Sequence, residues 1–138
     1  MTRARPRGER GAAAVEFALL LPLLLLIVFG LIDFGRAINA QITLTQAARE
    51  GARLAAFGQP VATVQSRTQA AATGLNVTTG EISVTTCPQN AGPAVDGSVT
   101  IRYPFTFVTP ISAISKLFGS GINGSYTLTA TGVVPCET

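Results

Sequence analysis

The sequence predicts an α+β fold in which a long N-terminal helix, membrane-spanning in its first half, packs on a small antiparallel sheet. Three observations lead to this prediction: an apolar block near the N-terminus, a helical period that continues beyond it, and a later change to alternating polar and apolar residues. The chain has 138 residues, which leaves room for one modest core outside the apolar block.

The apolar block extends from Gly11 to Ile32 and contains one carboxylate, Glu16. A helix from Ala12 to Ile32 would be roughly 31 Å long, close to the ~30 Å hydrocarbon thickness of a bilayer. We therefore expect a membrane-spanning helix. Pro22 lies inside it, and we expect a bend there, since membrane helices tolerate proline where neighbours satisfy the freed carbonyl.

The formal net charge of +3 belongs to the leader that precedes this block. Residues 1–11 contain four arginines and one glutamate, whereas residues 12–138 contain six basic and six acidic residues. Because the domain itself carries no excess of basic residues, nucleic acid is not an expected partner. Arginines at one end of an apolar helix are typical of its cytoplasmic end. We therefore expect the N-terminus in the cytoplasm and the domain outside it.

Three interpretations of the leader and block are open. A secretory signal, cut after Ala37, fits the basic leader, but ordinary signals have apolar regions of about 7 to 15 residues without a carboxylate. An uncleaved anchor fits the length of the block. The third interpretation depends on Glu16, because a carboxylate at the bilayer centre costs about 2.5–3.5 kcal/mol and usually has a partner. A hydrated position of Glu16 near the cytoplasmic interface is the simpler alternative.

Two segments carry a resemblance to a known family. They are RGAAAVEFALLLPLLLLIVFGLIDFGRA, which begins at Arg10, and TQAAREGARLAA, which ends at Ala56. Together they resemble the N-terminal region of TadE-type pseudopilins of the Tad (tight adherence, or Flp) pilus system. The resemblance implies a minor pilin or pseudopilin that acts in the biogenesis or assembly of this type IV pilus, with a fold that resembles pilins in outline.

The resemblance assigns roles to four residues. Pilins of this class are cut after a glycine by a membrane aspartic prepilin peptidase, and the fifth residue of the new chain is glutamate, followed by an aromatic residue. The corresponding residues here are Gly11, Ala12 as the new N-terminus, Glu16 and Phe17. Gly8 does not fit, because an alanine stands five residues after it. In related pilins the glutamate pairs with the terminal amine of a neighbouring helix, so the resemblance implies that Glu16, together with Phe17, acts in assembly.

The resemblance also implies partners and a location. The expected partners are prepilin peptidase, other Tad pilins or pseudopilins, the inner-membrane assembly platform and membrane lipid. The protein would cross the bacterial cytoplasmic membrane once, with its C-terminal domain in the periplasm or outside the cell. The major Flp pilins usually carry tyrosine at the position of Phe17 and are much shorter, which favours a minor pilin or pseudopilin. The alternative is an uncleaved, membrane-anchored periplasmic scaffold or binding protein.

The helical period continues beyond the membrane block. Polar residues recur at intervals of three and four from Arg36 to Arg53, beside a stripe of small and apolar residues from Ala37 to Leu54. We expect one helix to about Phe57, ended by Gly58. The small-residue stripe suits packing on the domain and contact with neighbouring helices equally well.

The chain is thus expected to divide into a basic leader at 1–11, a helix at 12–57 and an outer α+β domain at 58–138. At the outer end of the apolar block, Asp33 and Arg36 are expected to mark the water interface and to form an ion pair of a few tenths of a kcal/mol.

The outer domain is expected to start with a second helix over 60–73, capped by Gly74. Alternating residues then predict three strands, over 81–87, 99–107 and 125–134, with a loop over 88–97. Pro104 lies within the second strand and indicates an edge or a bulge. A short helix is expected over 110–118. The order of the strands does not follow from these patterns.

Cys87 and Cys136 are the two cysteines of the chain. Their separation excludes a C-x-x-C redox or zinc motif. In an oxidising compartment the default is a structural disulfide, which would stabilise the domain by about 4 kcal/mol by chain-entropy estimates. Two free buried thiols are the alternative.

Enzymatic activity is not expected. The chain contains no histidine, so it cannot supply a histidine base, a catalytic triad or an imidazole metal ligand. The carboxylates outside the apolar block are too scattered for an acid/base pair, and the G-x-G-x-x-G motif over 119–124 precedes a strand where a dinucleotide site needs a helix. We therefore expect no catalytic residue, metal or cofactor, and a membrane-bound hydrolase would need catalytic groups from partners.

Overall fold

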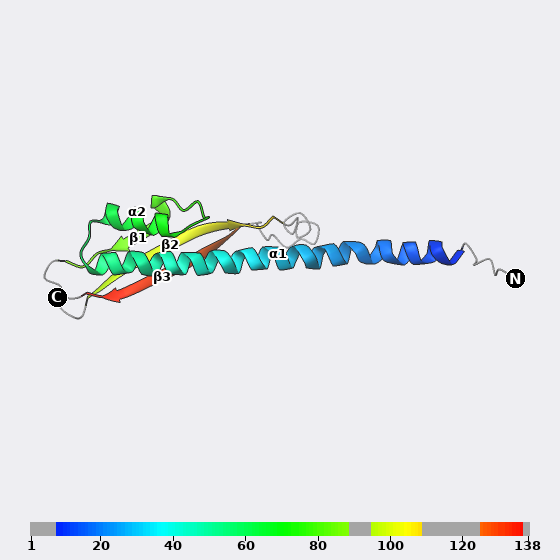
Figure 1. Ribbon diagram of the computed structural model, residues 1–138, viewed down its shortest axis with the longest axis horizontal. Helices are drawn as coiled ribbons and strands as arrows, with labels where there is room; N and C mark the ends of the chain where they lie inside the picture. Colours follow the sequence, from blue (N-terminus) through cyan, green and yellow to red (C-terminus); the bar gives the residue numbers. More distant parts are fainter. Residues whose placement is uncertain (1–7, 89–94, 109–124, 137–138) are drawn as a thin grey trace.

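The computed structural model describes residues 8–88, 95–108 and 125–136. Figure 1 shows a long helix, α1, whose C-terminal half lies along a small domain and whose N-terminal half projects away from it. The elements in chain order are α1 (Gly8–Ala56), α2 (Val61–Ala71), the 3-10 turn η1 (Thr79–Glu81), β1 (Ile82–Thr85), β2 (Asp96–Thr106) and β3 (Ser125–Pro135). The predicted α+β fold is therefore confirmed.

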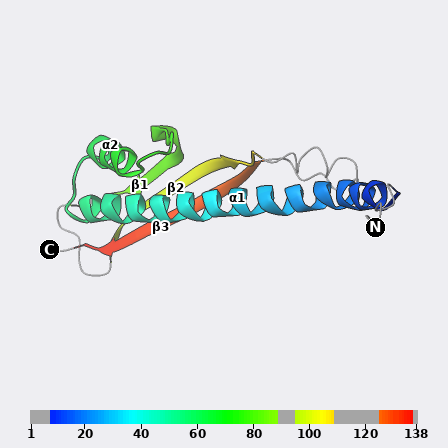
Figure 2. The ribbon, with the colours of Figure 1, turned by 45° about the vertical axis from the view of Figure 1, so that its right-hand side comes forward.

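Helix α1 is a single element of 49 residues. It passes through Pro22 without interruption, and Figures 1 and 2 show no sharp kink along it, in contrast to the expected bend. It ends at Ala56, close to the predicted end, and Gly58 turns the chain with a φ of 64°. A positive φ is the usual conformation of a glycine that ends a helix.

The sheet has the order β1-β2-β3, and both pairs are antiparallel. Strand β2 pairs with β3 along its whole length, but with β1 only over residues 98–101. Pro104 therefore lies in the central strand, at a place where β1 has already ended and only β3 is paired beside it. On the side where β1 has ended, no described strand would accept a hydrogen bond from an N–H at this position. Proline is therefore tolerated here in the central strand without a bulge.

The other elements differ from the predictions mainly at their ends. Helix α2 stops at Ala71, and Gly74 follows with a φ of 80°. Turn η1 was not expected; it is stabilised by Glu81, whose carboxylate accepts a hydrogen bond of 2.7 Å from the backbone N–H of Thr78. The predicted helix over 110–118 and the glycine motif over 119–124 lie outside the described residues.

Both helices pack on the sheet and on one another. Helix α1 contacts β2 and β3, whereas α2 contacts α1 and β1, and Figure 2 shows α1 crossing the sheet beside α2. The small-residue stripe of α1 is buried in this core, so its role as a packing face for the domain is confirmed. The core residues from α1 are Ala40, Leu44, Ala47, Ala48, Ala52 and Ala55. Those from the rest of the domain include Val64, Val77, Ile82, Val99, Ile101, Phe105, Leu128 and Ala130.

Two glycines allow α1 to lie directly on the backbone of the strands. A Cβ atom at Gly97 would lie 2.7 Å from the backbone nitrogen of Ala56, and one at Gly132 would overlap the carbonyl oxygen of Ala48. A side chain at either position would push the helix and the sheet apart, because well-packed interiors have no spare volume.

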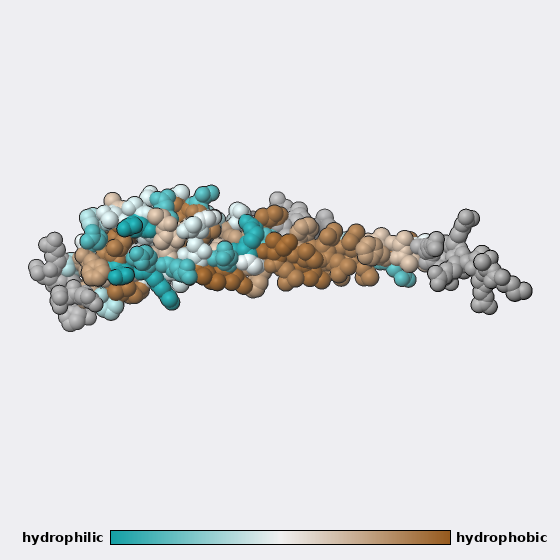
Figure 3. Space-filling model, in the orientation of Figure 1, coloured by the Kyte–Doolittle hydropathy of each residue, from teal (hydrophilic) through white to brown (hydrophobic). Residues whose placement is uncertain are grey.

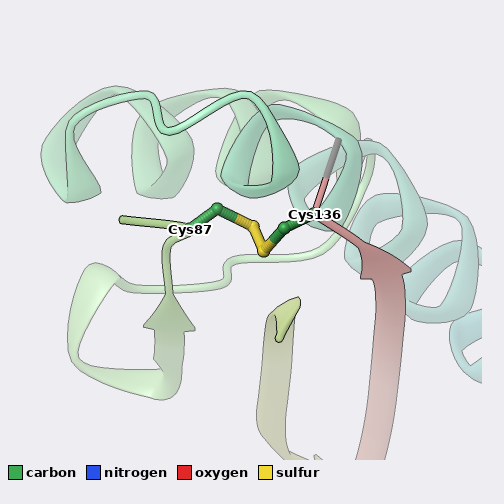
Figure 4. The surroundings of a disulfide bond; sticks show 2 residues. All are labelled: Cys87 and Cys136. Atoms are coloured by element: carbon green, nitrogen blue, oxygen red, sulfur yellow. A yellow bond between two sulfur atoms is a disulfide. The ribbon is translucent and has the colours of Figure 1, made fainter. Parts of the chain in front are cut away.

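A disulfide joins Cys87 and Cys136, whose Cα atoms are 5.8 Å apart, within the usual range. Cys87 follows β1 and Cys136 follows β3, so the bond connects the ends of the two outer strands (Figure 4). Both cysteines pack with Ala56, at the end of α1. The expected disulfide is thus present and lies directly under the helix.

Candidate functional site

The N-terminal half of α1 presents apolar side chains that no other described residue covers. Within the described part of the chain, α1 is the one helix long and apolar enough to cross a membrane, and its most apolar stretch has no buried residue. Figure 3 shows this half as a continuous hydrophobic surface beside a domain of mixed polarity. A surface of this size needs lipid or other helices around it, which makes α1 a candidate membrane anchor.

The residues predicted to direct processing lie on this open part of α1. The helix continues through Gly11 and Ala12 without a break. A Cβ atom at Gly11 would meet no other heavy atom within 4 Å. A substitution of Gly11 would therefore not disturb the packing of the domain.

Glu16 and Phe17 are exposed on the same helix, and Phe17 is 59% exposed. Glu16 lies roughly 7.5 Å along the axis from Gly11, at about 1.5 Å per residue. It makes no hydrogen bond or ion pair with another residue that the structure describes. Because an unpaired carboxylate in an apolar segment is unfavourable, a partner for Glu16 would have to come from outside the described part of the chain.

At the outer end of the apolar block, the expected ion pair between Asp33 and Arg36 is present, but the expected position of Asp33 at the water interface is wrong. Asp33 is not an exposed interface charge but is only 2% exposed. Its Oδ1 atom accepts hydrogen bonds from Nη1 of Arg36 at 2.9 Å and from the backbone N–H of Val108 at 3.1 Å. Asp33 is thus a buried acceptor that joins α1 to the segment directly after β2.

Arg36 extends this junction toward the sheet. Its guanidinium carbon lies 5.3 Å from the ring centroid of Phe105, a distance typical of cation–π contacts. Phe105 in turn packs edge-to-face against Phe107, with ring centroids 5.5 Å apart. The place where the apolar half of α1 ends is therefore also the place where the end of β2 is fixed to the helix.

The cysteine and carboxylate side chains of the described residues do not form a metal site. In residues 8–88, 95–108 and 125–136, no group of three histidine, cysteine, aspartate or glutamate side chains could hold a metal ion. The two cysteines are joined in the disulfide, and Glu81 holds turn η1.

Comparison with known proteins agrees with the features of α1. Residues 11–53 match the model of the family described as TadE-like protein. The match covers less than half of the chain and includes Gly11, Glu16, Asp33 and Arg36. No curated protein and no solved structure matched the chain. The resemblance that the sequence indicates is therefore confirmed for this segment.

Proposed function

We propose, from the TadE-like match of α1, that the protein is a non-enzymatic minor pilin or pseudopilin that acts in the biogenesis or assembly of a Tad-type pilus. The observation that carries this proposal is the division of α1 into two halves. One half is buried in the domain, whereas the other is uncovered, apolar and carries Gly11 and Glu16. The uncovered half is the part available to lipid and to other helices.

In this proposal α1 crosses the bacterial cytoplasmic membrane once. The arginine-rich leader stays in the cytoplasm by the positive-inside rule, and the domain lies in the periplasm or outside the cell. The Cys87–Cys136 disulfide supports this orientation, because such bonds persist in oxidising compartments. The proposed partners are prepilin peptidase, other Tad pilins or pseudopilins and the inner-membrane assembly platform.

Processing after Gly11 would remove the leader with its excess of positive charge and create a free amine on Ala12. We propose that Glu16 of one subunit pairs with this amine on its neighbour and sets the register between the two helices. The absence of a described partner for Glu16 supports this role. A charge pair in a low-dielectric environment is costly to break by removing one member.

Gly11→Val is expected to abolish processing. Wild-type protein isolated from native membranes should begin at Ala12, whereas the variant should keep all 138 residues, as measured by intact mass. The open space around Gly11 means that valine does not disturb the protein's own fold. Gly8→Val is the matched control, and it should be processed like the wild type. Shortening of Gly11→Val to Ala12 would contradict the assignment, and full-length wild type would favour the uncleaved scaffold.

Glu16→Gln is expected to separate maturation from assembly. Apart from the substitution, the variant should have the same mass as processed wild-type protein. Its recovery in complexes with other Tad pilins should fall roughly tenfold or more, because loss of one member of a buried charge pair costs several kcal/mol. Complexes from native membranes can be quantified on blue native gels. Glu50→Gln, which changes an exposed carboxylate of the outer half of α1, serves as the control. Unchanged recovery of Glu16→Gln would exclude the pairing role.

A further inference from the structure

Strand β3 is an edge strand without the usual protection against further pairing. It has eleven residues, none of them charged, and among the described strands it pairs on one side only, with β2. Its register with β2 runs from Asp96↔Pro135 to Thr106↔Ser125 without a bulge, and its one proline is the last residue. Natural edge strands usually carry charges, internal prolines or bulges, or are very short, as β1 is with four residues.

A side chain of α1 shows which backbone groups of β3 lie at the free edge. Nε2 of Gln41 donates a hydrogen bond of 3.0 Å to the carbonyl oxygen of Thr129. In an antiparallel strand the N–H and C=O of one residue point to the same side, and the side alternates along the strand. The backbone groups of Thr131 and Val133 therefore also point to the free edge. No described side chain forms a hydrogen bond with them there, in contrast to Gln41 at Thr129.

A groove of about 590 Å³ lies beside this part of β3, between the strand and the end of α1. Its lining residues are Arg49, Arg53, Ala56, Phe57, Val133 and Val134. Phe57 is 59% exposed and Val133 is 56% exposed, so the groove offers apolar as well as basic side chains.

The two arginines of the groove have no partner within the described part of the chain. Neither Arg49 nor Arg53 makes an ion pair or hydrogen bond there. They lie one helical turn apart, and like charges at this spacing destabilise a helix by about 0.2–0.5 kcal/mol. Arg53 is in the last turn of α1, where a cation is favourable, but Arg49 lies one turn earlier. Glu50 lies between them along the helix but pairs with neither, so both guanidinium groups are available next to an open strand edge.

We propose that β3 and this groove bind an extended acidic segment of a partner protein, which joins the sheet as a fourth strand. Backbone hydrogen bonds to Thr131 and Val133 would hold the segment, as in other complexes formed by strand addition. Every second side chain of the added strand faces α1, so carboxylates there would reach Arg49 and Arg53 in charge-assisted hydrogen bonds.

Charge complementarity favours a different chain over a second copy as the occupant. The two outer strands through which copies would pair are β1 and β3, and neither contains a carboxylate. A second copy paired through these strands would leave the arginines uncompensated.

The proposal can be tested with two synthetic peptides of seven residues, one alternating glutamate with valine and the other alternating lysine with valine. Each is titrated into the full chain in detergent micelles at physiological salt, where long-range attraction is largely screened. The acidic peptide should bind roughly tenfold more tightly than the basic one or better, a difference of about 1.4 kcal/mol. It should also slow hydrogen exchange at the amides of Thr131 and Val133.

Two variants separate the edge from the groove. Arg49→Glu combined with Arg53→Glu should reverse the preference between the peptides, whereas Arg67→Glu combined with Arg102→Glu, exposed elsewhere on the domain, should not. Thr131→Pro removes one edge N–H without a ladder bond and should weaken the acidic peptide roughly tenfold.

Three results would overturn the proposal. The first is equal affinity for the two peptides, which would mean that Arg49 and Arg53 do not recognise carboxylates. The second is an equal response to the two double-arginine variants, which would mean unspecific charge attraction. The third is protection of Thr131 and Val133 without peptide that rises with protein concentration, which would make a second copy the occupant.

Discussion

Replacement of both cysteines, Cys87→Ala with Cys136→Ala, is expected to lower the free energy of unfolding of the outer domain by about 4 kcal/mol. The bond closes a loop with a sequence separation of 49 that contains β2 and β3 in full. It also ties together the ends of the two outer strands, which do not pair with one another. Without the bond, the unfolded chain between the two cysteines can adopt many more conformations, so folding loses more conformational entropy.

The measurement is urea unfolding of the full chain in detergent micelles, followed by tyrosine fluorescence. The chain has two tyrosines and no tryptophan, and Tyr103 and Tyr126 lie in β2 and β3, so the signal reports on the sheet and not on the uncovered half of α1. Reduced wild-type protein is the control for the lost packing volume, since it keeps both sulfur atoms. Equal unfolding midpoints for oxidised and reduced wild type would show that the bond contributes no constraint.

Asp33→Ala is expected to release the end of β2 from α1 and to destabilise the domain by about 1.5–3 kcal/mol, the range for hydrogen bonds to charged groups. The substitution removes the acceptor of the Val108 N–H and of Arg36 at once. Exchange of the Val108 amide should accelerate roughly tenfold or more, because 1.4 kcal/mol corresponds to a factor of ten. Hydrogen exchange and the tyrosine-monitored urea titration check the two expectations separately.

Two further variants show whether burial of Asp33 matters. Asp33→Asn keeps an acceptor oxygen but removes the charge, and it should fall between wild type and Asp33→Ala. Asp96→Ala removes an exposed carboxylate of β2 and should change stability by less than about 0.5 kcal/mol. If Asp33→Ala and Asp96→Ala behaved alike, the junction would not hold the sheet to the helix.

Features with a local period could be predicted from the sequence. The stripe that contains Ala40, Leu44 and Ala47 repeats at helical intervals, and these residues are buried against the sheet. The alternation around Val99 and Ile101 likewise indicated a strand with one buried face. Such patterns depend only on neighbours in the chain, so the α+β class and most elements follow from them.

Apart from the disulfide, for which two cysteines allow a single pairing, features that depend on distant residues could not be predicted. Asp33 and Val108 are 75 positions apart, and no periodicity reports that the end of β2 returns to α1. The place of Pro104 in the sheet could not be predicted either, because a central strand tolerates proline there only where β1 has already ended. The sequence predicted Asp33 as an interface charge paired with Arg36, whereas the packing of the domain buries Asp33 and adds its hydrogen bond to Val108.

The candidate site shows the same division. Gly11 and Glu16 follow from a sequence motif within one helix, and the structure adds that both positions are open to other molecules. The groove between Arg53 and Val133 requires the end of α1 and the end of β3 to be adjacent. Only the fold brings these two segments together.

Because α1 is continuous, its uncovered half and the domain are expected to move as one rigid unit. No loop or glycine turn separates the uncovered half from the half packed in the core, because a single helix runs from Gly8 to Ala56. From Asp33 to Ala56 the arm is about 35 Å long, so a change of about 10° in the tilt of the span in the proposed membrane setting would move its far end by about 6 Å. In that proposed setting, forces that tilt the helix would displace the groove at the opposite end of α1.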